Sequence, residues 1–257
     1  MTMTVTTSHH AHVGEIRFSR PPHNFASPAL IGRIADALEA FDAHPNIRCS
    51  VLVAEGKSFC GGADLGGDDS LVGQAGMDVV GQLYQQAARL HRRKKPMIAA
   101  VQGAAVGAGL GLALAADFRV ASPEARFSAN FVRLGFHPGF GLTHSVPRLI
   151  GAHRATWMML SAERVKPDVA LEWGLIDKLT PLAGLLAEAH RMADEIAQNA
   201  PLALIAVRKT MLAGVADQME AAMRQEHAEQ TILKATADYK EGVASVFARR
   251  DAHFSGT

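Results

Sequence analysis

Short apolar runs recur in the first half of the chain, and segments with helical patterning separate them. Runs of this kind occupy residues 50–54, 97–101 and 118–120, and polar residues or glycine bound them. Because helices separate consecutive runs, the pattern favours stacked strand–crossover units over a hairpin sheet. After Pro138 the pattern turns helical almost to the end, and a wholly helical third begins near residue 200. The sequence therefore predicts an α/β chain that ends in a helical region.

The length of 257 residues suits one large domain with a helical appendage. We expect a polar, flexible N-terminus at residues 1–12, a core at 13–200 and a helical region at 201–257. The remaining expected strands are 14–19 and 175–179. The expected helices are 27–44, 78–91, 107–116, 167–173, 182–199, 202–214 and 217–250.

Composition narrows the class of protein. With 26 Lys+Arg against 25 Asp+Glu, nothing supplies the broad cationic face that nucleic acid requires. Cys49 and Cys60 cannot form a disulfide framework, and no CxxC pair offers a metal site. The apolar stretch 97–116 is rich in Gly and Ala and contains Gln102, which argues against a membrane span. The start lacks a basic segment followed by an apolar one, so we expect a cytoplasmic chain without a secretory signal.

The glycine run at residues 107–111 allows three interpretations. Leu112 stands where the dinucleotide fingerprint needs its third glycine, and no P-loop lysine follows, so nucleotide binding is disfavoured. Small residues also let a buried helix approach a neighbour closely. The third interpretation adds Gly61-Gly62-Ala63-Asp64, which follows a strand as residues 103–109 follow another. Main-chain N–H groups from two such loops would hold a carbonyl oxygen that becomes negative during a reaction.

At these residues the chain resembles the crotonase (enoyl-CoA hydratase/isomerase) superfamily. The segment Phe59-Cys60-Gly61-Gly62-Ala63-Asp64-Leu65 is similar to the family's F-x-x-G-x-D-[LI] loop. Residues 95–103, running into 107–117, are similar to its K-P-x-I-A-A-V-N-G…G-G-G…D segment. Further blocks agree in order and spacing. They are Phe127, Leu134-Gly135, Pro138-Gly139, Leu149-Ile150-Gly151, Gly174-Leu175-Ile176-Asp177, and Glu241-Gly242 followed by Arg249-Arg250.

The resemblance implies a ββα-spiral core, with residues 201–257 as a helical trimerisation region and an assembly of trimers or dimers of trimers. It implies an acyl-CoA substrate whose thioester enolate is stabilised by the N–H groups of Ala63 and Ala108. Coenzyme A enters as part of the substrate, and no other cofactor or metal is expected. Phe131 would contribute a wall of the acyl pocket. The implied coenzyme A contacts are His23, Asn24, Phe25, Cys60, Gly61, Gly62, Asp64, Leu65, Gly107 and Arg249.

The chain departs from the family's hydratases at both catalytic glutamates. The first should lie three residues after the second oxyanion donor, where Gly111 stands, and the second four residues after Phe127, where Phe131 stands. Between residues 79 and 162 the only carboxylates are Asp117 and Glu124, which we interpret as structural and surface residues. Without a carboxylate base the chain is not expected to be an efficient 2-enoyl-CoA hydratase.

Other groups could transfer protons. Tyr84 falls on a helix that would line the acyl pocket, near the histidine of a related aryl-CoA dehalogenase branch, although Gly139 replaces that branch's nucleophilic aspartate. The alternative for Tyr84 is a half-buried ring with a wet hydroxyl. His137 lies in a block that flanks family active sites, and a neutral imidazole titrates in the useful range. Cys60 is interpreted as packing, and His91 to Lys95 as a solvated helix end.

Several activities remain open within the resemblance. Decarboxylation of a malonyl-type thioester needs mainly an oxyanion site, because loss of CO₂ itself generates the enolate. Thioester hydrolysis would need His137, or a C-terminal acid such as Glu226 or Glu241, to enter the pocket. A non-catalytic subunit that binds coenzyme A thioesters is the alternative from another class. It would show affinity without turnover.

Overall fold

The computed structural model describes residues 2–64 and 78–257. Within them, two sheets form the centre of an α/β fold. The larger has the strand order β1-β2-β3-β4-β6-β9, and only its β1–β2 pair is antiparallel. Its strands are β1 (Thr4–His10), β2 (Val13–Ser19), β3 (Cys49–Ala54), β4 (Met97–Val101), β6 (Phe118–Ala121) and β9 (Lys178–Leu179). The smaller sheet comprises β5 (Ala104–Val106), β7 (Arg126–Ser128) and β8 (Arg164–Val165).

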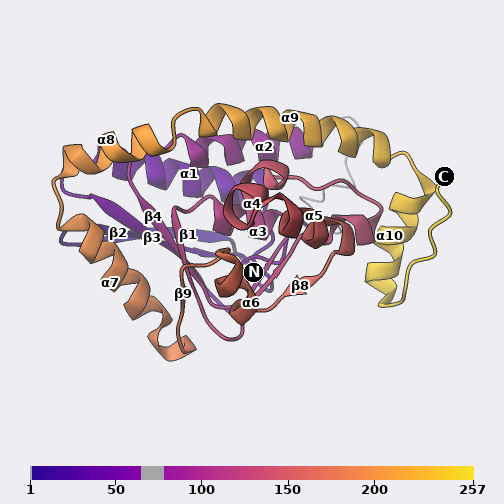
Figure 1. Cartoon of the computed structure of the whole chain (residues 1–257), viewed down its shortest axis with the longest axis horizontal. Coiled ribbons are helices and arrows are strands. Elements are labelled where there is room, and N and C mark those ends of the chain that lie inside the picture. The colour runs from indigo at the N-terminus through magenta and orange to yellow at the C-terminus, as the bar shows by residue number, and fades with distance from the viewer. Residues whose placement is uncertain (1, 65–77) are drawn as a thin grey trace.

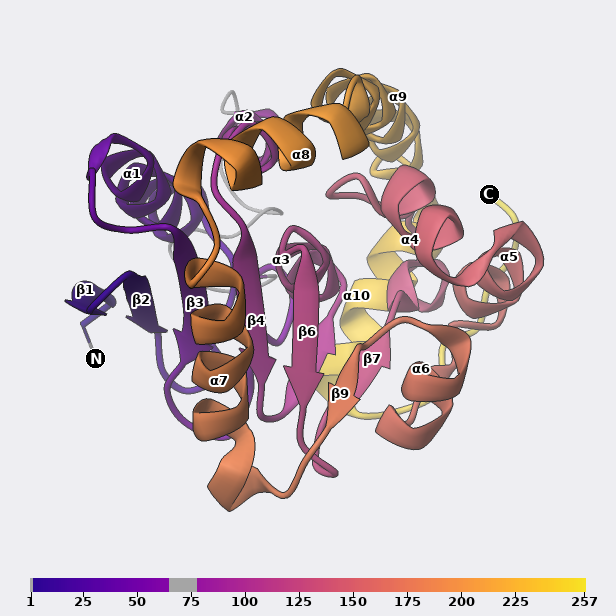
Figure 2. The same cartoon turned by 60° about the vertical axis from the view of Figure 1, so that its left-hand side comes forward.

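Helices cover both faces of the larger sheet (Figures 1 and 2). They are α1 (Pro28–Ala43), α2 (Val79–His91), α3 (Ala108–Leu114), α4 (Leu142–Ile150), α5 (Ala152–Ser161), α6 (Pro167–Trp173), α7 (Leu185–Ala197), α8 (Pro201–Met211), α9 (Val215–Leu233) and α10 (Ala237–Ala248). Helix α7 packs on one face, where Leu185 and Ala189 meet Val51 and Ile98. The other face belongs to a larger core beneath α1, α2 and α3. Because side chains alternate along a strand, each central strand contributes to both cores.

Local chemistry explains where the predicted helices start. The Ser27 side chain accepts a hydrogen bond from the N–H of Leu30, and Pro28 occupies the first helical position of α1. The Asp78 carboxylate caps α2 in the same way, accepting from the N–H of Gly81 at 2.8 Å. The fully buried run of residues 97–101 forms β4 with the predicted bounds. The expected α/β fold with a helical C-terminal region is confirmed.

The N-terminal segment differs from the expectation of flexibility. Residues 4–10 form β1, which pairs with β2 in register from Thr4↔Ser19 to His10↔Val13. Most side chains of β1 are exposed, so the strand is held through its main chain and carries little apolar signal. The predicted helix over 217–250 is also interrupted, because Thr236 starts a new helix by accepting from the N–H of Tyr239.

The basic segment 91–95 was predicted to be solvated, and this prediction is wrong for Arg93 and Lys95, whereas Arg92 and Lys94 are exposed. Arg93 is buried and pairs with Asp117 at 2.6 Å, and Arg208 of α8 approaches the same carboxylate at 3.1 Å. Lys95 is also buried, and its ammonium donates to main-chain carbonyls at the end of α1. The structural interpretation of Asp117 is confirmed, since it joins the end of α2 to the C-terminal helices. None of the helices in residues 2–64 and 78–257 combines the length and hydrophobicity needed to span a bilayer.

Candidate active site

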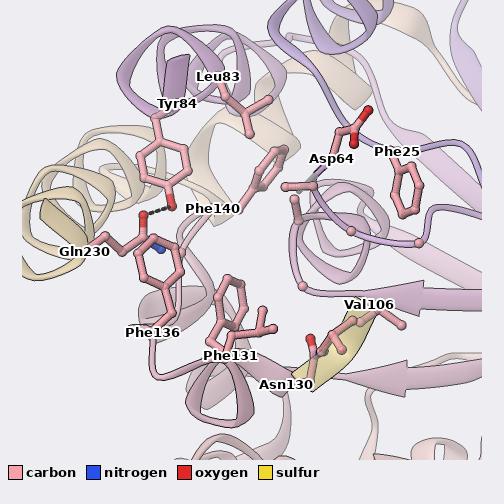
Figure 3. Close-up of a pocket in the computed structure, with 18 of the residues that line it drawn as sticks. Phe25, Asp64, Leu83, Tyr84, Val106, Asn130, Phe131, Phe136, Phe140 and Gln230 are labelled. Carbon is pink, nitrogen blue, oxygen red and sulfur yellow. Dashed lines mark hydrogen bonds between the residues drawn. The ribbon is translucent and has the colours of Figure 1, made fainter. Parts of the chain in front are cut away.

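The two glycine-containing loops singled out in the sequence meet at one cavity of about 350 Å³. The N–H of Val106 donates to the carbonyl of Cys60 at 3.1 Å, which joins the loops through their main chains. The approach is so close that a Cβ at Gly109 would lie 2.0 Å from the Cys60 carbonyl oxygen. The cavity lining, most of it drawn in Figure 3, comprises Phe25, Gly61, Gly62, Ala63, Asp64, Leu83, Tyr84, Val106, Gly107, Ala108, Asn130, Phe131, Leu134, Phe136, Gly139, Phe140, Gln230, Val246 and Phe247.

Ala63 and Ala108 both line this cavity. Ala108 is the first residue of α3, so its N–H precedes the helix's own hydrogen-bonding pattern. Gly107 turns the chain into α3 with φ +53°, a value that favours glycine. Neither the Ala63 nor the Ala108 N–H donates to any of the described residues. Two main-chain donors at one cavity therefore remain available.

Aromatic side chains occupy the region around positions 111 and 131, where the resemblance predicts the two glutamates of a hydratase. A Cβ at Gly111 would lie 2.4 Å from Cδ1 of Phe140, so the Phe140 ring fills the space beside α3. Phe131 lines the cavity next to Gly107, where a Cβ would meet its Cζ at 3.5 Å. No carboxylate occupies position 111 or 131, and the packing leaves position 111 no room for one.

Tyr84 lines the cavity, as the sequence predicted, but its hydroxyl is not wet. It donates to Oε1 of Gln230 at 2.9 Å (Figure 3). Nε2 of Gln230 donates in turn to the His137 carbonyl at 2.8 Å. Burial raises the pKa of Tyr84 above its ordinary value, with the Glu226 carboxylate as a further cause. A Cβ at Gly139 would lie 1.9 Å from the Tyr84 hydroxyl. The tyrosine–glutamine pair thus stands where a side chain at position 139 would be.

The other proposed acids and bases do not line the cavity. The ring of His137 turns to the Pro138 carbonyl, which lies 2.7 Å from Nδ1. Glu226 is buried behind Phe140, where its carboxylate accepts from Gly141 N–H at 2.7 Å and from Thr143. Burial raises the pKa of Glu226. Glu241 pairs with an arginine near the C-terminus, which lowers its pKa to about 2. The structure therefore does not bring these three residues to the acyl pocket.

The predicted coenzyme A contacts divide into two groups. Phe25, Gly61, Gly62, Asp64 and Gly107 line the cavity, as does Phe131, the predicted wall of the acyl pocket, whereas His23, Asn24, Cys60 and Arg249 do not. Asn24 is buried and bonds three main-chain groups, and Cys60 is buried, which raises its thiol pKa to about 11. Both residues therefore have structural positions. For Cys60 this agrees with its interpretation as a packing residue, and for Asn24 no structural role was predicted. Leu65 lies outside the described residues. Arg249 is exposed beyond the end of α10.

Sequence reasoning missed Asn130, Phe136, Phe140 and Gln230. Asn130 has a distinct position, because its side-chain amide makes no hydrogen bond to any described residue and lies beside Gly107. Its oxygen would lie 3.8 Å from a Cβ at Gly107. A polar residue immediately before Phe131 was the available signal. Gln230 lies 146 residues from Tyr84, so no local pattern could pair them.

The sequence of this chain is similar to those of known enzymes. The profile of the enoyl-CoA hydratase/isomerase family matches residues 8–257. The chain belongs to that family, within the crotonase superfamily. A protein named mevalonyl-coenzyme A hydratase from Beauveria bassiana is 34% identical to this chain. The match covers 93% of this chain and 90% of the relative. A 1,2-epoxyphenylacetyl-CoA isomerase from Escherichia coli is 30% identical, with 94% of each chain covered.

Solved structures of this family agree with the fold. The carnitinyl-CoA hydratase of Mycobacterium avium has a TM-score of 0.87 and 28% identity, with both chains covered in full. An enoyl-CoA hydratase/isomerase from Pseudoalteromonas atlantica also has a TM-score of 0.87 at 28% identity, covering 98% of this chain and 99% of its own. The relatives carry the names of different reactions, so family membership leaves the reaction to be inferred from the site.

Proposed function

We propose that this chain is an acyl-CoA enzyme that holds a thioester oxygen between the N–H groups of Ala63 and Ala108. The observation that carries the proposal is the meeting of these two unused donors at one apolar cavity. Such donors stabilise an oxygen that gains negative charge, and they cost no reorganisation during the reaction. The same geometry supports a thioester enolate as the common intermediate.

The reaction is not an efficient hydration of 2-enoyl thioesters. Hydration needs a base that activates water, and among the described lining residues the only carboxylate is Asp64. Asp64 is paired with Arg20 at 3.2 Å. The rings of Phe131 and Phe140 make much of the remaining wall apolar, which favours binding of an acyl group over binding of water.

The test uses proline at position 108. Proline suits the first position of a helix, so Ala108→Pro should fold; it removes the N–H and places the Cδ of its ring where that hydrogen pointed. We expect kcat/KM for any accepted thioester to fall by about 10²–10³. Ala108→Gly keeps the N–H and serves as the matched control. Equal turnover by both variants would contradict the role of this donor.

A second candidate, decarboxylation of a malonyl-type thioester, is favoured by Asn130. In this reaction the electron pair of the Cα–carboxylate bond moves to Cα, CO₂ leaves, and a solvent proton then joins Cα. No base is needed, and the side-chain amide of Asn130, which makes no hydrogen bond to a described residue, would orient the carboxylate. Among the described lining residues no Lys, Arg or His would hold the carboxylate charge in the ground state.

A panel of methylmalonyl-, crotonyl- and aryl-CoA thioesters distinguishes these outcomes. If decarboxylation is the reaction, Asn130→Asp should repel the carboxylate and abolish turnover, whereas Asn130→Gln should retain part of it. Release of CO₂ that is insensitive to Asn130→Asp would exclude this use of the amide. Affinity without turnover across the whole panel would instead support the non-catalytic binding subunit.

A further proposal concerns self-association, as trimers or dimers of trimers. On helix α8 the side chains of three apolar residues are largely exposed to solvent: Leu202 (80% exposed), Val207 (62%) and Met211 (73%). A cavity of about 700 Å³ also lies between α8 and the core. An apolar surface of this kind suits contact with a second copy of the chain. Light scattering should give a molar mass of at least three chains, and Val207→Glu should lower it. A monomer at micromolar concentration would contradict the proposal.

A further inference from the structure

We infer that the acyl end of the cavity selects acyl groups that carry an aromatic ring. This inference rests on the proposed function, because it names the substrate class of the same site. Aromatic residues make up only 6% of the chain, yet Tyr84, Phe131, Phe136 and Phe140 gather at one part of the cavity lining. In Figure 3 Tyr84, Phe131 and Phe136 lie on the side of the cavity away from Phe25. We call these four residues the aromatic end.

The rings are already arranged as aromatic partners. Tyr84 and Phe140 meet edge to face, with centroids 6.5 Å apart and an interplanar angle of 87°. Phe136 contacts the Tyr239 ring, with centroids 4.9 Å apart and an interplanar angle of 35°. A ring presents a negative face and a positive edge, so an aromatic guest gains from both orientations where a saturated ring does not.

The backbone at Phe140 supports a dedicated role. Phe140 has φ +62°, a left-handed conformation that is uncommon for a bulky residue. The following residue, Gly141, is held by the Glu226 carboxylate, which also accepts from Thr143. Such a conformation persists only where the surroundings impose it, and it clusters at ligand sites. The buried glutamate thus positions the Phe140 ring against the cavity.

The polar groups at the aromatic end are satisfied within the protein. The Tyr84 hydroxyl donates to Gln230, and Gln230 donates in turn to the His137 carbonyl. A polar acyl terminus would have to break this pair to find a partner, and a buried polar group without a partner is costly. This part of the cavity therefore favours an apolar guest, and the rings favour an aromatic one.

A matched pair of ligands tests the inference. Phenylacetyl-CoA and cyclohexylacetyl-CoA share every atom of coenzyme A and the same carbon skeleton, and differ in the π-system and the planarity of the ring. With two or more ring contacts available, we expect phenylacetyl-CoA to bind about tenfold more tightly in calorimetric titration. Replacing Phe140 or Phe136 by leucine should reduce the ratio to about two- or threefold. Two separate variants are used so that poor folding of one leaves the other informative.

The control substitution is Phe254→Leu, because Phe254 is exposed and does not line the cavity. It should keep the tenfold ratio. Equal affinity for the two ligands, or a ratio that neither leucine variant changes, would overturn the ring preference while leaving the thioester site intact. If no thioester binds more tightly than free coenzyme A, the proposed function itself fails, and the ring preference with it.

Discussion

Replacing Gly111 by alanine adds one methyl group at a crowded point of α3. The new Cβ would lie 2.4 Å from Cδ1 of Phe140 and 2.9 Å from its Cβ and Cγ. Overpacking of a core typically costs about 1–3 kcal/mol, whereas alanine gains about 1 kcal/mol over glycine inside a helix. We therefore expect the free energy of unfolding to fall by up to about 2 kcal/mol.

Gly32→Ala is the matched control. Gly32 also lies inside a helix, α1, but its new Cβ would meet only the end of the Gln86 side chain, at 3.2 Å. A flexible side chain can move aside, so this variant should be neutral or more stable by up to about 1 kcal/mol. Urea unfolding at one fixed protein concentration measures both variants, and a shifted midpoint with an unchanged slope reports stability.

A double-mutant cycle then tests the cause. Phe140→Gly removes all three clashing atoms and suits the left-handed backbone at that position. In this background only the helix preference for alanine remains, so Gly111→Ala should stabilise by about 1 kcal/mol, which gives a coupling energy of about 1–3 kcal/mol between the two positions. A Gly111→Ala variant as stable as Gly32→Ala would refute the reasoning. So would a cost that persists unchanged when Phe140 is glycine.

Three further predictions concern residues outside the cavity. Burial, together with the charges of Arg93 and Arg208, lowers the pKa of His91 from 6.5 to about 3. Between pH 6.5 and about 3, His91 is protonated in the unfolded chain but neutral in the folded chain, so the free energy of unfolding should fall as the pH falls. In His91→Gln the unfolding midpoint should depend less steeply on pH. An unchanged slope would exclude His91. Asp117→Asn removes the partner of buried Arg93 and should cost about 3–5 kcal/mol in urea unfolding, and a loss below about 1 kcal/mol would contradict its role. Asn24→Ala loses hydrogen bonds to three main-chain groups and should cost at least about 2 kcal/mol, and thermal unfolding at the wild-type temperature would argue against this.

Local patterns predicted the elements that carry a local signal. The buried strand β4 and the starts of α1 and α2 at Ser27 and Asp78 follow from apolar runs and capping residues. The strand β1 escaped prediction, because an edge strand held by main-chain pairing needs no apolar side chains. The strands β5, β7 and β8 have two or three residues each, too few for any periodicity to appear. Burial of Arg93 depends on Asp117 and on distant α8, so the basic run gave a misleading solvated pattern.

The sequence by itself determined the residues from which the proposed site is argued, and the resemblance to the family gave them their proposed roles. The loops around Ala63 and Ala108, and the absence of acids at Gly111 and Phe131, are properties of single positions and their spacing. Only the tertiary structure decided what fills the space that remains. Phe140 packs against α3 from 29 positions further along the chain, and Tyr84 finds Gln230 across 146 residues. A hydrogen-bond donor is a local feature of the chain, whereas the shape of a cavity depends on which distant side chains fold against it.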